Sequence, residues 1–308
     1  MNSLHRDAIV VGVDGSSGSL SAVDFAVSQG RRIGAHVRVV HVVPTMSALT
    51  PAPMMVSPPT DLVETGHRIL DRALARARGA ASGLHVEPEL RHGSRALELA
   101  AAAKDARMLV VGRDSRPVLD RMLLGDTAAG VASRAACPVV SVPPEWRADE
   151  VKGVVAVGIK SVDQAQVLLT DAFCVAEAHD ARMVVVHAWR LPSGYDDIIE
   201  SRVAQSDWST RGARELDEVI APYRARHPGV EVTIQVSHAC AHDALERAAR
   251  QADLVILARR AHGFPAATHL GGTARHVLRA AACPVRVIAP EQRPTTETSD
   301  RQHVAALH

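Results

Sequence analysis

The sequence predicts an α/β protein made of two tandem copies of one domain, each with a parallel five-stranded sheet flanked by helices. Apolar strand-like runs alternate with helical patterns along the chain, which indicates parallel strands joined by right-handed crossovers. The 308 residues are 47% hydrophobic but only 3% aromatic, a composition that suits Val-rich buried strands covered by Ala-rich helices. A long internal repeat indicates the tandem organisation.

The repeat places matched residues 146 positions apart. Gly12, His41, Gly125, Cys137 and Pro138 recur as Gly158, His187, Gly271, Cys283 and Pro284. A length difference of two residues near 94–108 is the only slippage expected. We therefore predict domain 1 at 1–144, a linker at 145–150, domain 2 at 151–290 and a disordered tail at 291–308, because the tail is polar and lacks a sustained period.

The first elements of the first copy follow from local patterns. Residues 8–13 are a short apolar run typical of a buried strand, and the turn DGSSGS after it offers one of its serines as the N-cap of a helix. Residues 36–43 form the second strand. A Pro-rich and Met-rich connection follows, and helical spacing begins near Thr60.

The remaining elements set the strand order. Residues 85–90 read as the third strand, and Pro88 confines it to a sheet edge, where a missing N–H is harmless. A helix, a strand, a helix and a fifth strand follow at 95–104, 107–112, 126–136 and 138–143. These features predict the order 3-2-1-4-5, with the topological switch between strands 1 and 4. Ligands of open α/β sheets bind there, outside the carboxyl ends of the strands, where Asp14 and Gly112 follow.

Bulk properties exclude several classes of protein. A formal net charge of +1 gives no long-range field towards nucleic acid or an anionic membrane, so neither partner is expected. The four cysteines form no CxxC pair, which predicts reduced thiols and a cytoplasmic protein. The apolar run near residue 8 is too short for a signal segment or a membrane span. The GxxxxGK[ST] and GxGxxG motifs are absent, which disfavours a P-loop ATPase and a dinucleotide dehydrogenase.

Several stretches together resemble the universal stress protein family. They are VVGVDGS at 10–16, His41 with Val42, VVG at 110–112, LLG at 123–125 and ACPVVSVP at 136–143. The resemblance covers 7–144 and 151–290. It implies a flavodoxin-like (adenine nucleotide alpha hydrolase-like) fold, a cytoplasmic location and pairing of the two domains through their fifth strands. In one branch of the family it implies ATP, bound by the pattern Gly, two residues, Gly, nine residues, Gly, then Ser or Thr.

On the nucleoside side, the first copy matches what the resemblance implies. Asp14, followed by Gly15, matches the acidic residue beside the nucleoside, and Val42 matches the position whose backbone faces adenine. In the second copy Lys160 replaces the Asp. The resemblance therefore implies a nucleoside site in the first copy and a degraded one in the second.

On the phosphate side, both copies depart from the pattern. Gly112 and Gly125 match the first and third glycines, but Ser115 replaces the second glycine and Asp126 replaces the Ser or Thr. The second copy has Ala258 and Ala261 in place of the first two glycines and keeps Gly271, Gly272 and Thr273.

Asp126 opposes phosphate binding in two ways. Its carboxylate can cap the helix itself, and it faces phosphate as a like charge, a repulsion of about 3 kcal/mol at about 5 Å and an effective dielectric of about 20. That lowers affinity roughly a hundredfold unless a Mg²⁺ or Mn²⁺ ion, held by Asp126, bridges the two. Thr127 offers a hydroxyl in its place, and Arg113 offers a guanidinium to phosphate.

Two functions follow from these residues. The first is a stress-response protein that binds ATP, with or without Mg²⁺ or Mn²⁺, mainly in its first copy, and acts as a regulator or sensor with at most slow hydrolysis. The alternative is a nucleotide-free module that engages an unknown protein partner. The fifth-strand edges are satisfied by pairing within one chain, and homodimerisation stays open.

Overall fold

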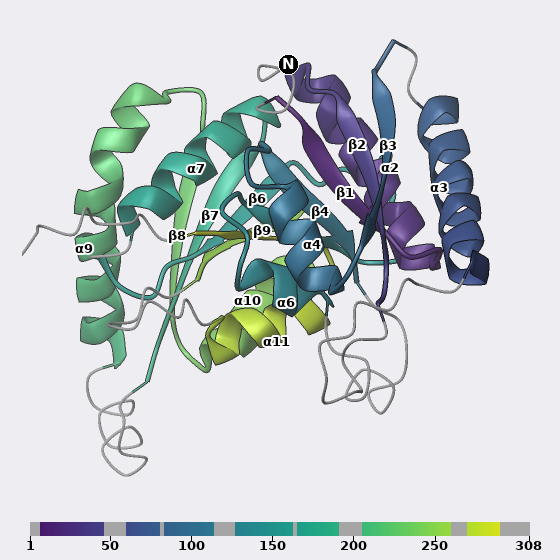
Figure 1. The fold of residues 1–308 in the computed structure, drawn as a ribbon. Coiled ribbons are helices and arrows are strands. Elements are labelled where there is room, and N and C mark those ends of the chain that lie inside the picture. The colour runs from purple at the N-terminus through teal and green to yellow at the C-terminus, as the bar shows by residue number, and fades with distance from the viewer. Residues whose placement is uncertain are drawn as a thin grey trace, which may run out of the picture.

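The computed structural model describes residues 7–45, 60–80, 83–113, 127–162, 165–190, 205–259 and 270–289. Strands and helices alternate through both halves of the chain, as the sequence predicts (Figure 1). The first half comprises β1 (Ile9–Val13), α2 (Ser17–Ile33), β2 (Val37–Val43), α3 (Thr60–Ala80), β3 (Val86–His92), α4 (Arg95–Ala102), β4 (Met108–Gly112), α6 (Thr127–Ala132) and β5 (Val139–Val142). The second comprises β6 (Val154–Gly158), α7 (Ala165–Ala178), β7 (Arg182–Trp189), α9 (Gln205–Arg226), β8 (Val232–His238), α10 (Ala241–Ala249), β9 (Leu254–Ala258), α11 (Gly272–Ala280) and β10 (Val285–Ile288).

The strands form one sheet of ten, in the order β3-β2-β1-β4-β5-β10-β9-β6-β7-β8. Within each half the order is the predicted 3-2-1-4-5, and every pair is parallel. The prediction of parallel sheets needs one correction, because β5 and β10 pair antiparallel and fuse the two halves into a mixed sheet. The fifth strands thus meet within the chain, as the family resemblance implied.

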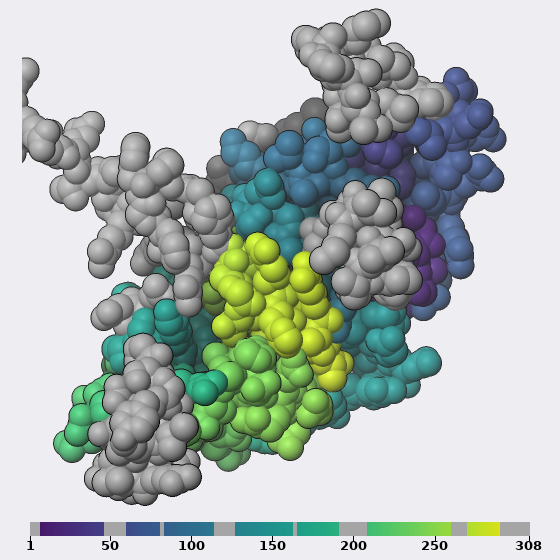
Figure 2. All heavy atoms as spheres, turned by 90° about the horizontal axis from the view of Figure 1, so that it is seen from below, coloured from purple at the N-terminus to yellow at the C-terminus, as the bar shows by residue number. Residues whose placement is uncertain are grey.

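The helices cover the sheet in two layers that both run across the junction. One apolar core contains residues of α2, α3, α7 and α9, and the other contains residues of α4, α6, α10 and α11. Figure 2 views the second layer, where α10 and α11 lie side by side. A continuous core on each face makes the two halves one packed body.

The 146-residue displacement holds without slippage from the third to the fourth strand of each half. β3 and β8, α4 and α10, and β4 and β9 each begin 146 positions apart. The expected two-residue length difference near 94–108 is therefore wrong. Because the segments from β3 to β4 and from β8 to β9 have the same length, matched positions in them can be compared directly.

The start of α2 shows how the turn after β1 is built. Ser16 is the N-cap, and its Oγ accepts a hydrogen bond from the Ser19 N–H at 3.2 Å. Gly15 has φ 83°, a left-handed conformation that glycine adopts without strain. The serine-rich turn predicted as a helix start therefore caps α2 and leads the chain away from the end of β1.

Paired polar contacts reinforce the junction of the two halves. The Arg113 Nη1 donates to the backbone oxygen of Arg279 at 3.1 Å, and the matched Arg259 Nη1 donates to the backbone oxygen of Ala132 at 3.1 Å. Each guanidinium thus serves the last turns of a helix in the opposite half, where carbonyl groups lack helical partners. The two arginines occupy matched positions of the internal repeat, and their acceptors differ by one position, since Ala132 matches Leu278.

The segment predicted as a linker packs against the first half. Its Trp146 ring meets the Phe25 ring edge-on, with the centroids 5.2 Å apart. The Ser21 hydroxyl donates to the backbone oxygen of Pro144, the residue directly before this segment, at 2.7 Å. In the described residues, no helix is long and apolar enough to cross a membrane.

His179 provides a pH-dependent test of the junction. Its Nε2 donates to the Gln29 Oε1 of the other half at 3.0 Å, and burial, helped by Arg32, lowers its pKa to about 4. Between about pH 6.5 and pH 4 the unfolded chain binds a proton that the folded chain refuses. The free energy of unfolding should therefore fall as the pH is lowered from about 6.5 to about 4, by up to about 3 kcal/mol from this group.

Urea denaturation at several pH values measures this effect. The His179→Gln variant keeps a polar side chain that does not titrate, so its stability should depend less on pH, while the other histidines contribute equally to both proteins. Equal pH dependence in the two proteins would contradict the assignment.

Candidate functional site

A hollow lies at the carboxyl ends of β1 and β4, the switch point predicted from the strand order. Four predicted site residues line it: Asp14, Val42, Gly112 and Thr127. Gly15 and Arg113 are described but do not line it, and Ser115, Gly125 and Asp126 lie outside the described residues. The hollow has a cavity volume of about 40 Å³, much less than a nucleoside occupies. The described residues therefore supply a floor for a ligand rather than an enclosing pocket.

Asp14 is exposed and held in place by the turn that follows it. Its Oδ1 accepts hydrogen bonds from the Ser16 N–H at 3.0 Å and from the Ser16 hydroxyl at 2.6 Å. The same hydroxyl oxygen accepts the Ser19 N–H as the cap of α2. This chain of hydrogen bonds fixes the direction of the carboxylate at the rim of the hollow.

Gly112 is required by packing. A Cβ placed on it would lie 2.3 Å from the Gly18 carbonyl carbon and 2.5 Å from the Ser19 nitrogen. A Cβ on Gly18 would lie 2.4 Å from the Arg113 carbonyl oxygen. Gly112 is not among the residues with positive φ. The family resemblance relates this glycine to phosphate binding, and the structure shows a packing reason for it, because the end of β4 touches the first turn of α2.

Arg113 points to the junction and not into the hollow. Its Nη1 is bonded to Arg279 in the other half, and burial lowers its pKa below the ordinary value for arginine. The side chain expected to meet phosphate is therefore engaged elsewhere. Because Gly112 lines the hollow and Arg113 follows it directly, this contact connects the hollow to α11.

The lining also contains polar residues that were not among the predicted site residues. Arg95, the first residue of α4, brings a positive charge to the hollow, and Ser16 and Ser19 bring hydroxyl groups. The Gly93–Ser94 pair lies after a strand and directly before a helical pattern. This helix-start signal could have placed Arg95 at the carboxyl ends of the strands.

His41 has a structural role near the end of β2. Its Nδ1 donates to the Val13 backbone oxygen at 2.7 Å, and burial lowers its pKa. The matched His187 Nδ1 donates to the Ile159 backbone oxygen at 2.9 Å. Each ring ties the end of one strand to the next.

The second half presents a different surface at the matched positions. Lys160 follows β6 and is exposed, and Ala258 ends β9. Gly271 is the N-cap of α11 and has no side chain with which to cap it. Gly272 and Thr273 are the first helical residues. Ala261 lies outside the described residues. A cation at Lys160 cannot accept a hydrogen bond from a ribose hydroxyl, which the Asp14 carboxylate can do.

Comparisons with known proteins agree with this fold. The universal stress protein family model matches residues 5–143 and 153–289. A universal stress protein of Mycolicibacterium smegmatis is 30% identical, with 92% of this chain and 97% of the relative covered. One of Mycobacterium tuberculosis is 28% identical at the same coverage. The crystal structure of a universal stress protein from Archaeoglobus fulgidus matches with a TM-score of 0.68 at 18% identity, over 94% of this chain and 98% of that chain.

The contact between β4 and α2 can be tested with a matched pair of glycine variants. Gly112→Ala should lower the free energy of unfolding by about 1–3 kcal/mol, because the added methyl group meets backbone atoms that cannot turn aside. Gly79→Ala on α3 meets nothing within 4 Å, so it should be neutral or stabilise by up to about 1 kcal/mol. Urea denaturation compares the two, and equal stabilities would refute the packing role of Gly112.

Proposed function

The chain belongs to the universal stress protein family, and from that premise we propose that its first half binds an adenine nucleotide as a regulatory or sensor function. The observation that carries the proposal is the hollow at the switch point, where the fold brings Asp14, Val42, Gly112 and Thr127 together. These residues come from separate places in the sequence. They meet at the edge of an open α/β sheet where ligands bind.

The chemistry of the lining supports a nucleoside with phosphates. The exposed Asp14 carboxylate has acceptor capacity left on Oδ2 for a ribose hydroxyl, since both bonds from Ser16 are on Oδ1. The backbone near Val42 offers N–H and C=O groups to a base, as the family resemblance implies. Arg95 and the Thr127 hydroxyl supply a charge and a donor for phosphate.

The proposed ligand is ATP, with Mg²⁺ or Mn²⁺ where the metal offsets the charge of Asp126. A binding role with at most slow hydrolysis fits the lining. The Ser16 hydroxyl, which the Asp14 carboxylate holds, is already committed as the cap of α2. The proposal also places the protein in the cytoplasm, where its four cysteines remain thiols.

The alternative is a nucleotide-free module for protein interaction. Two observations favour it: the small volume of the hollow, about 40 Å³, and the acidic residue at position 126. Calorimetric titration with ATP and Mg²⁺ separates the two functions, because the alternative requires that the unaltered chain releases no binding heat.

Asp14 and Lys160 form a matched pair for testing the asymmetry of the halves. Asp14→Ala should weaken ATP binding about 10- to 100-fold, the expected loss of one charge-assisted hydrogen bond of about 1.5–3 kcal/mol. Lys160→Ala removes the matched side chain of the second half and should leave the affinity unchanged. If the Lys160 variant lost affinity and the Asp14 variant did not, the nucleotide would bind in the second half, and the proposal would be wrong.

Asp126→Ser tests the electrostatic argument from the sequence. Removing the carboxylate should tighten ATP binding roughly a hundredfold when no metal is present, because about 3 kcal/mol of repulsion is removed. The gain should shrink when Mg²⁺ is added, because the ion already neutralises the repulsion in the unaltered chain. An unchanged affinity in metal-free buffer would show that Asp126 does not face the phosphates.

A further inference from the structure

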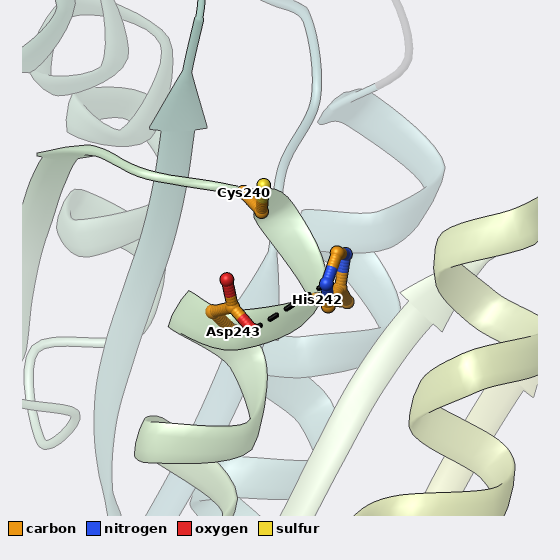
Figure 3. A group of neighbouring side chains, drawn as sticks. All are labelled: Cys240, His242 and Asp243. Carbon is orange, nitrogen blue, oxygen red and sulfur yellow. Dashed lines mark ion pairs between the residues drawn. The ribbon is translucent and has the colours of Figure 1, made fainter.

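We propose that the second half carries a zinc-type metal site on the first turn of α10, formed by Cys240, His242 and Asp243. Their ligand atoms, one thiol sulfur, one imidazole nitrogen and one carboxylate oxygen, all lie within 4.8 Å of one another. Figure 3 shows the three side chains around the start of the helix. Nucleotide binding in the first half is not required for this site.

The internal repeat shows that these residues are a local feature of the second half. The matched positions in the first half hold Ser94, Ala96 and Leu97. Cys240 is the N-cap of α10 but makes no side-chain capping bond, and cysteine is not among the residues favoured as N-caps. The stability of the helix therefore does not account for the cysteine, whereas metal ligation does.

Neighbouring side chains pack around the cluster, and one of them bonds a proposed ligand directly. The His242 ring contacts the His276 ring of α11, with the centroids 4.7 Å apart. The His276 Nε2 is hydrogen-bonded to the Glu246 carboxylate of α10. The Arg190 Nη1 donates to the Cys240 sulfur at 2.9 Å. Hydrogen bonds and packing of this kind fix the orientation of ligands around a metal.

The supporting residues are also absent from the first half. Ala100 and Gly130 stand at the positions matched to Glu246 and His276. All three proposed ligands and both of these neighbours thus differ from the matched residues of the first half, and they lie where two helices of the second layer are side by side (Figure 2). The second half thus has Lys160 at the position of Asp14, and it has a cluster of nitrogen, sulfur and oxygen donors that the first half lacks at the matched positions.

The donor set selects the class of metal. Thiolate and imidazole suit Zn²⁺, while Mg²⁺ and Ca²⁺ prefer oxygen ligands alone. In a tetrahedral zinc site the bonds are about 2.0–2.3 Å, so neighbouring donors lie about 3.5 Å apart. Three protein ligands leave a fourth position for water, and the partial exposure of the cluster gives an ion a path from solvent.

Metal binding to the untagged full chain tests the site. After removal of metals with a chelator, the chain should bind one equivalent of Zn²⁺ by calorimetric titration. Co²⁺ in its place should give an absorption band for thiolate-to-metal charge transfer. Cys240→Ser, which restores the residue type of Ser94, should remove the band and weaken zinc binding more than about 100-fold, beyond the usual effect of losing an outer-shell group.

Cys174→Ser is the matched control, because Cys174 is an exposed thiol on α7. It should keep both the zinc affinity and the cobalt band. His242→Ala should lose zinc affinity as Cys240→Ser does, and circular dichroism verifies that each variant is folded. The proposal is overturned if the unaltered chain binds no stoichiometric zinc, or if folded Cys240→Ser and His242→Ala variants bind it as tightly as the unaltered chain.

Discussion

The antiparallel pairing of β5 with β10 is the constraint on which the rest of the structure depends. Val139, Val140 and Ser141 pair with Val287, Arg286 and Val285, and this contact turns two five-stranded sheets into one of ten. It covers two sheet edges that would otherwise present unpaired backbone groups. The strands of the two halves then run in opposite directions. The carboxyl ends of the two sets of strands therefore lie at opposite ends of the strands of the shared sheet. The two switch points are thereby separated, which leaves each free to diverge.

The two halves differ at these separated switch points. The first half keeps an acid after β1 and a glycine at the end of β4, and these residues line a hollow with Val42 and Thr127. The second half has Lys160 and Ala258 at the matched places. The halves nevertheless remain physically linked, because Arg113 beside the hollow reaches the last turns of α11 and Arg259 reaches the end of α6. A ligand that moves the end of β4 would therefore act on the junction.

Much of the fold was predictable because the repeat and the strand pattern are local properties of the sequence. Asp14 and Gly112 could be assigned to one edge since parallel topology brings carboxyl strand ends together. The role of Arg113 could not be predicted, because its partner is a backbone oxygen 166 residues away. The reason for Gly112 was equally hidden, since it depends on the approach of Gly18. The metal cluster matches no familiar spacing, and packing of α11 supplies its His276 neighbour.

The proposed functions place a nucleotide mainly in the first half and a metal ion in the second. The most direct measurement is a crystal structure of the full chain grown with ATP and Mg²⁺. We expect one nucleotide per chain, with its ribose at Asp14 and its base at Val42. Nucleotide at the carboxyl ends of β6 and β9, or in both halves equally, would contradict it.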